Sequence, residues 1–277
     1  MRLFIRLLGR LRVLKYFNLK VNLTGITIPI IYEFGRDNLV MTEPWMEQVI
    51  EKLYRIKKGT FVDVGVNIGQ TLIKLKLIDR GADYIGFEPN PSCVFYSNEL
   101  IKVNNLKNTL IVPVAISEES SLVTLFFYSN TIMDSSASII KDFRPQKIFK
   151  TEYVPAFNYF SIQSVFNDKT ISIIKIDVEG AELSVLRSMN DLIHRDRPFV
   201  LVEVLPVYSN DNIDRVDRQN GIERLIQEWD YKLFRISKNL NETLKGFEPL
   251  GEFGLTTDVS QSDYLICPME LLAKLEQ

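Results

Sequence analysis

The stretch FVDVGVNIG, residues 61–69, joins an apolar, β-prone run to an aspartate and to two glycines four residues apart. Gly65 and Gly69 allow the backbone to turn sharply and to approach a ligand closely. Apolar strands and helices alternate from this point along the chain. We predict strands at 60–64, 84–87, 110–114, 171–176 and 199–205, and helices at 70–79, 91–104 and about 181–192. This alternation favours βαβ units and a parallel α/β sheet.

The remainder of the chain follows this pattern less closely. A β-strand of another kind is expected at 121–128, and the polar stretch 129–159 is interpreted as an irregular insertion. A helix at 221–229 and strands at 232–236 and 264–267 complete the prediction. We therefore divide the chain into a lead-in segment, residues 1–58, and one main domain, residues 59–277.

Composition excludes several classes of protein. The formal net charge of -2 argues against nucleic-acid binding, which usually needs a basic face. Two cysteines, Cys93 and Cys267, provide neither a disulfide framework nor a zinc site, so a reducing compartment such as the cytoplasm is expected. His194 is the single histidine, and mechanisms that need a histidine pair are therefore excluded.

The first twenty residues are basic and apolar, with no acid before Glu33. They are too interrupted by arginine for a membrane span or a secretory signal. A helix here would gather charge on one side. It would either lie on an anionic membrane surface, at the inner face of a membrane, or pack on the domain or a partner subunit, which we favour.

Carboxylates follow four of the predicted strands, namely Asp63, Glu88, Asp177 and Glu203. Ligands of doubly wound sheets bind at the carboxyl ends of the strands. Acids at an apolar edge are unfavourable unless they are paired or bind something, so this edge is the candidate site.

The glycine spacing is G-x-x-x-G, which differs from the G-x-G-x-x-G of dinucleotide-binding folds. An acid at the first turn would repel a pyrophosphate but suits a ligand with an ammonium group. Glu88 has the position and chemistry to bind two ribose hydroxyls. An adenosine ligand with an amino-acid end, S-adenosylmethionine (SAM), satisfies both conditions.

Four motifs in this order, FVDVGVNIG, IGFEPNP, IIKIDVEGAELSVL and RPFVLVEV, resemble the FkbM-type SAM-dependent methyltransferases over residues 61–205. The resemblance implies a Rossmann-like class I methyltransferase fold, with a mostly parallel seven-stranded sheet, helices on both faces and an antiparallel last strand. It also implies methyl transfer, usually to oxygen on sugars or other small molecules. By position, it places Asp63, Gly65, Asn67 and Gly69 at the methionine part of SAM, Glu88 at the ribose, Ala115 and Ile116 at the adenine, and Asp177, Glu179 and Glu182 at the active cleft.

One departure bears on mechanism. Many relatives have a histidine soon after the glutamate that matches Glu203, where this chain has Leu205 and Pro206. His194 is predicted to lie at the far side of the sheet. We therefore expect a carboxylate base, Asp177 or Glu203, with Glu179 beside them, because two close carboxylates raise one pKa. The pair Asp177 and Glu203 is alternatively predicted to hold a divalent metal such as Mg²⁺.

The predicted insertion is interpreted as a substrate lid or as a disordered loop. Ser135 and Ser136 within it, together with Glu182, are the predicted substrate contacts.

The sequence thus favours a SAM-dependent methyltransferase that methylates a hydroxyl of a saccharide or another small molecule, in polysaccharide biosynthesis. The alternative is a non-catalytic SAM-binding or scaffold protein of a glycan-assembly system. An NAD(P) oxidoreductase is disfavoured by the glycine spacing. An amino-directed nucleic-acid methyltransferase is disfavoured because IDVEGAE stands where an Asn/Asp-Pro-Pro-aromatic run is expected. The acceptor and the oligomeric state stay open.

Overall fold

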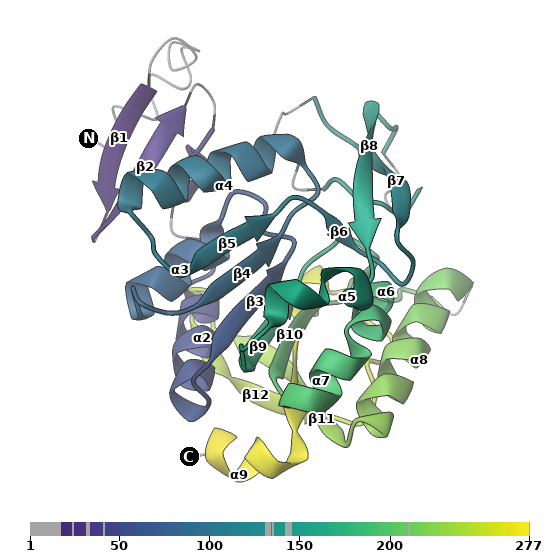
Figure 1. Cartoon of the computed structure of the whole chain (residues 1–277). Helices are drawn as coiled ribbons and strands as arrows, with labels where there is room; N and C mark the ends of the chain where they lie inside the picture. Colours follow the sequence, from purple (N-terminus) through teal and green to yellow (C-terminus); the bar gives the residue numbers. More distant parts are fainter. Residues whose placement is uncertain are drawn as a thin grey trace.

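The apolar run Thr60–Val64 forms strand β3, which lies inside an eight-stranded sheet between β9 and β4 (Figure 1). All five of its residues are buried, as is typical of a strand covered on both faces. The computed structural model describes residues 18–23, 25–31, 34–40, 42–130, 134, 136–141, 146–209 and 211–276.

The sheet follows the order β12-β11-β13-β10-β9-β3-β4-β5. Its strands besides β3 are β4 (Tyr84–Phe87), β5 (Thr109–Val112), β9 (Ile171–Ile176), β10 (Phe199–Glu203), β11 (Tyr231–Lys238), β12 (Leu244–Leu250) and β13 (Asp263–Pro268). Strands β10, β9, β3, β4 and β5 pair in parallel, whereas β13 is antiparallel to both of its neighbours. The predicted antiparallel last strand is confirmed.

The predicted number of seven strands is short by one. Strand β12 pairs antiparallel with the edge of β11. Its sequence, LKGFEPL, contains a glycine and a proline and has no buried residue, so it lacks the apolar run or alternation by which strands are recognised.

Helices cover both faces of the sheet (Figure 1). Helices α2 (Pro44–Ile56), α3 (Gln70–Ile78) and α4 (Pro91–Asn104) contribute to one buried cluster, and α5 (Tyr159–Ile162), α6 (Glu182–Ser188), α7 (Asn190–Asp196) and α8 (Ile213–Glu228) contribute to the other. The short helices are η2 (Asp37–Leu39), η3 (Gln163–Phe166), η4 (Val259–Gln261), η5 (Met269–Leu271) and α9 (Leu272–Leu275).

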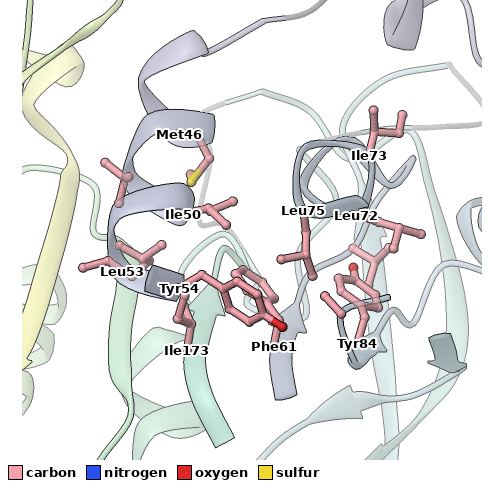
Figure 2. Close-up of a cluster of buried hydrophobic side chains, with 14 of the residues drawn as sticks. Met46, Ile50, Leu53, Tyr54, Phe61, Leu72, Ile73, Leu75, Tyr84 and Ile173 are labelled. Carbon is pink, nitrogen blue, oxygen red and sulfur yellow. The ribbon is translucent and has the colours of Figure 1, made fainter. Parts of the chain in front are cut away.

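The first face is held by aromatic and aliphatic side chains between α2, α3 and the sheet (Figure 2). Phe61 of β3 is fully buried and stacks on Tyr84 of β4, with 6.0 Å between the ring centroids. Ile50 and Leu53 of α2 and Leu75 of α3 belong to the same cluster. This packing fixes α2 against the strands that end at the candidate site.

Most predicted elements of the main domain are confirmed. The bounds predicted for 60–64, 84–87, 91–104 and 171–176 match the structure. The single helix predicted at 181–192 is wrong: Met189 leaves helical geometry, with ψ of 10°, and separates α6 from α7. Helix α8 begins eight residues before the prediction, because its first half is charged and exposed and carries little apolar periodicity.

The lead-in segment contains more regular structure than predicted. Residues 18–20 belong to strand β1 (Asn18–Leu23), so the expected basic helix is wrong there, and residues 1–17 lie outside the described residues. The buried Val21 and Leu23 alternate with the exposed Lys20 and Asn22, a period of two that suits the hairpin with β2 (Ile26–Ile31). Within the described part of the chain, every helix is too short or too polar to cross a membrane.

The predicted insertion is only partly irregular. Strand β8 (Lys150–Phe157) is the middle strand of a small sheet, between β6 (Ala115–Ile116) and β7 (Ser121–Phe127). The prediction of irregular structure is therefore wrong for residues 150–157. The strand was not predicted because Pro155 argues against a strand that is paired on both sides. In the structure β6 pairs only with Ala156 and Phe157, so at Pro155 strand β8 has a partner on the β7 side alone.

We expect Phe61→Ala to lower the free energy of unfolding by about 3–5 kcal/mol, because it leaves a cavity between α2, α3 and the sheet. Urea denaturation of the purified protein would measure this. Phe95→Ala is the matched control, because Phe95 is 51% exposed, and it should change the value by less than about 1 kcal/mol. Equal effects of the two substitutions would contradict this account of the core.

Candidate active site

Two adjoining cavities open at the carboxyl edge of the sheet. The larger has a volume of about 270 Å³. Eight of the predicted site residues line it, namely Gly65, Asn67, Glu88, Ala115, Ile116, Asp177, Glu179 and Glu203. The strands that carry the predicted carboxylates, β10, β9, β3 and β4, are direct neighbours in the sheet, so the predicted gathering of acids at one edge is confirmed.

The smaller cavity, of about 70 Å³, lies between the first turn of α2 and the ends of β9, β10 and β13. Glu43, Trp45, Met46, Lys175 and Asp263 line it. Six residues line both cavities: Glu43, Gly65, Asn67, Gln70, Asp177 and Glu203. We call this shared wall the junction.

Glu88 is held in the larger cavity by the two turns that flank it. Its carboxylate accepts hydrogen bonds from the backbone amides of Asn67, at 2.7 Å, and Asn90, at 2.8 Å. Burial raises the pKa of Glu88 to about 7, although these two hydrogen bonds act in the opposite direction. The carboxylate therefore links the glycine turn after β3 to the start of α4.

Gly65 is required by the packing of two neighbouring turns. Its φ is +92°, and a Cβ atom there would lie 1.9 Å from the backbone oxygen of Asp177. Every other residue type would separate the end of β3 from the end of β9. The glycine thus brings Asp177 to the junction.

A buried ion network lies directly beneath the junction. The Nζ atom of Lys175 is 3.5 Å from Asp63 Oδ1 and 3.1 Å from Asp177 Oδ2, and the hydroxyl of Tyr84 donates to Asp63 Oδ2 at 2.6 Å. Burial acts to lower the pKa of Lys175, but the charges of Asp177 and Asp63 outweigh it and raise that pKa. Burial in turn raises the pKa of Asp63, and the lysine and tyrosine offset part of this. Lys175 therefore supplies one positive charge that these two carboxyl groups share.

Glu203 ends β10 at the junction. Burial raises its pKa to about 9, and the charges of Asp177, Asp263 and Glu179 add to the effect. Ser262 Oγ donates to its Oε1 at 3.2 Å. This carboxyl is therefore protonated near neutral pH, and a neutral acid can donate a hydrogen bond of its own.

Four other predicted site residues do not line either cavity. Asp63 lies in the ion network, Gly69 begins α3, and Ser136 bonds to Asp134. Glu182 is buried and accepts a hydrogen bond from the Gly180 amide at 2.6 Å, which suits the start of α6. Ser135 lies outside the described residues. His194 is exposed near the end of α7, far from the carboxyl edge as predicted.

Several lining residues were missed by the sequence prediction. Glu43, Trp45 and Met46 belong to the lead-in segment, and Asp263 comes from a strand distant in sequence. Lys175 had a usable signal, because it is a charged residue inside the fully buried strand ISIIKI and must therefore be paired.

The family model for the methyltransferase FkbM domain matches residues 63–233, more than half of the chain. The protein belongs to the FkbM methyltransferase domain family. It is accordingly a SAM-dependent methyltransferase of class I architecture.

Solved structures similar to this FkbM-domain protein are distant from it. FkbM methyltransferase from Methylobacillus flagellatus KT is 15% identical with a TM-score of 0.46, and the match covers 75% of this chain and 43% of that one. This chain thus spans less than half of that protein. SAH-bound PaMTH1 of Podospora anserina is 9% identical (TM-score 0.43; 80% and 76% covered). An O-methyltransferase of Bacillus cereus in complex with SAH is 11% identical (TM-score 0.44; 81% and 78% covered). No curated protein matches by sequence.

The residues of this FkbM-domain protein do not fit the predicted metal site at Asp177 and Glu203. Across the described residues, no group of three or more His, Cys, Asp or Glu side chains is arranged to hold a metal ion. The Lys175 ammonium already pairs with Asp177 at 3.1 Å, so a positive charge is present where the metal was predicted.

We expect the stability of the FkbM-domain protein to fall as pH rises from 5 to 9. In the unfolded chain Glu203 loses its proton near its ordinary pKa of 4.5, whereas in the folded protein it keeps that proton up to a pKa of about 9. Between these two values the folded state binds one more proton than the unfolded state, so stability falls as pH rises. Glu203→Gln should therefore flatten the decline by up to about 1.4 kcal/mol per pH unit. Urea denaturation at pH 5, 7 and 9 measures this, with the exposed Glu119→Gln as control. Parallel slopes for wild type and Glu203→Gln would refute the assignment.

Proposed function

We propose that this protein transfers the methyl group of SAM to a hydroxyl oxygen of an uncharged acceptor, such as a saccharide in polysaccharide assembly in the cytoplasm. SAM would occupy the larger cavity and the acceptor the smaller one. The observation that carries this proposal is the junction, where the two cavities share the carboxyl groups of Asp177 and Glu203.

The larger cavity suits SAM in one orientation. Glu88, Ala115 and Ile116 line this cavity and not the smaller one, so they favour the adenosine end at the far wall. Glu88 can accept from two ribose hydroxyls, and Ala115 and Ile116 give an apolar surface for the base. The amino-acid end and the sulfur then lie towards Gly65 and Asn67, next to the junction.

The charges around the smaller cavity favour a neutral acceptor. Each of three lining carboxylates pairs with a lysine: Glu43 with Lys74, Asp177 with Lys175, and Asp263 with Lys238. Glu203 is protonated near neutral pH. Lys175, which is already paired, is the only basic residue among the described residues that line this cavity. The wall is therefore polar but offers no cation for a phosphate or a carboxylate, and it suits hydroxyl groups better.

The chemistry needs a place for one proton. SAM, when bound, supplies a methyl group activated by its positively charged sulfur. When the acceptor oxygen bonds to the methyl carbon, the carbon–sulfur bond would break with its electron pair going to sulfur, and Asp177 would accept the hydroxyl proton. Glu203, as a neutral acid, donates a hydrogen bond that orients the acceptor oxygen. Holding the reacting groups in line supplies much of the remaining acceleration.

The placement of the cofactor is tested by calorimetric titration of S-adenosylhomocysteine (SAH). We expect saturable binding to the wild type and a loss of at least tenfold in affinity for Glu88→Ala, about 1.4 kcal/mol. Glu99→Ala, on the outer side of α4, is the control and should bind as the wild type does. No binding of SAH to the folded wild-type protein would refute the proposed function.

The assignment of the base is tested by the release of SAH from SAM with a panel of uncharged glycosides, uronic acids and amino sugars. We expect turnover with uncharged glycosides, and Asp177→Asn should lower kcat by about 10²–10⁴-fold, because the hydroxyl proton loses its acceptor. The exposed Glu119→Gln is the control. Wild-type turnover by Asp177→Asn, or a preference for charged acceptors, would count against the proposal.

A further inference from the structure

A buried lysine of α3 lies beside the junction without lining either cavity. Lys74 has a side chain that is 3% exposed, and it lies one helical turn after Gln70, which lines both cavities. Both residues also border a small space next to the junction. Residues four apart share one face of a helix, so the Lys74 ammonium is directed towards the same end of α3 as Gln70.

The partner of this ammonium is unusually accessible. Within the described residues, Lys74 makes one ion pair, with Glu43, whose Oε2 lies 3.1 Å from Nζ. The side chain of Glu43 is 46% exposed and lines both cavities. The negative charge of Glu43 also acts on Lys175. A carboxylate beside the junction thus lies between two buried ammonium groups.

The two lysines differ in how easily they can change partners. Lys175 compensates Asp63, which is fully buried, so a new partner there would leave a buried charge unpaired. Glu43 can return to water at little cost, because nearly half of its side chain is already exposed. Lys74 is therefore the cation near the junction that can accept a carboxylate from a ligand.

The amino-acid end of SAM carries such a carboxylate, and the two cavities otherwise present mainly acids. Among the described residues that line them, Lys175 is the sole basic one. We propose that Lys74 binds the carboxylate of the amino-acid end of SAM, which takes the place of Glu43. This inference rests on the proposed position of the cofactor in the larger cavity. In this proposal Lys74 of α3 contacts the cofactor, and Glu43 of the lead-in segment competes with the cofactor carboxylate for Lys74.

Two nucleosides can be used to test this contact separately from the rest of the site. SAH has the amino-acid end, whereas 5′-methylthioadenosine lacks it and keeps the adenosine. Calorimetric titration of both into Lys74→Met should show a loss of at least tenfold for SAH and less than twofold for 5′-methylthioadenosine. Lys76→Met is the matched control, because Lys76 is a buried lysine of the same helix that donates to the Ala82 and Lys107 carbonyls; it should leave the ratio of the two affinities unchanged.

Equal losses for both ligands, or an unchanged affinity for SAH, would overturn the proposal. Glu43→Gln gives an independent test if Lys74→Met does not fold. It removes the competing carboxylate, so SAH should bind at least as tightly as to the wild type; a fivefold weakening would overturn the inference. Wild-type protein that binds neither nucleoside would refute the proposed function together with this contact, whereas wild-type binding of both with an unaffected Lys74→Met would refute the contact alone.

Discussion

The buried ion network of Asp63, Lys175 and Asp177 is the constraint on which the site depends. Asp63 and Lys175 lie directly opposite each other on the paired strands β3 and β9, so the sheet itself brings the two charges together. A charged group so deep in the protein is tolerated only when it is paired. The network therefore ties the strand that carries the glycine turn to the strand that ends in Asp177. It also determines the charge at the point where the two cavities meet.

The same pairing extends around the smaller cavity. Glu43 and Asp263 have lysine partners on α3 and β11, and Glu203, which lies among other acids, holds a proton instead. Part of the negative charge predicted at this edge is thus compensated in the folded protein. An environment of this kind can accept a proton at one carboxylate and donate a hydrogen bond from its neighbour, and neither role needs a histidine or a metal ion.

The two segments outside the main βα pattern take places different from those that the sequence favoured. Residues Trp45 and Met46 of α2, within the lead-in segment, line the smaller cavity. The segment interpreted as a substrate lid contributes Asp134, Ala137 and Ile139 to the larger cavity, where Asp134 is fixed by the backbone amides of Tyr128 and Ser129. These three residues therefore adjoin the proposed cofactor position rather than the proposed acceptor position.

The sequence by itself determined the parallel core and the acids at its carboxyl edge. Fully buried strands are continuous apolar runs, and motifs such as FVDVGVNIG keep the glycines and the acid at fixed distances from the strand end, so both features are local. Only the tertiary structure decided which acids stay charged and which residues share a cavity. Lys175 reaches Asp63 across 112 positions of sequence, and Glu43 meets Lys74 through the packing of α2 on α3. Burial and charge pairing depend on neighbours that strand order and helix packing supply, and no local pattern records them.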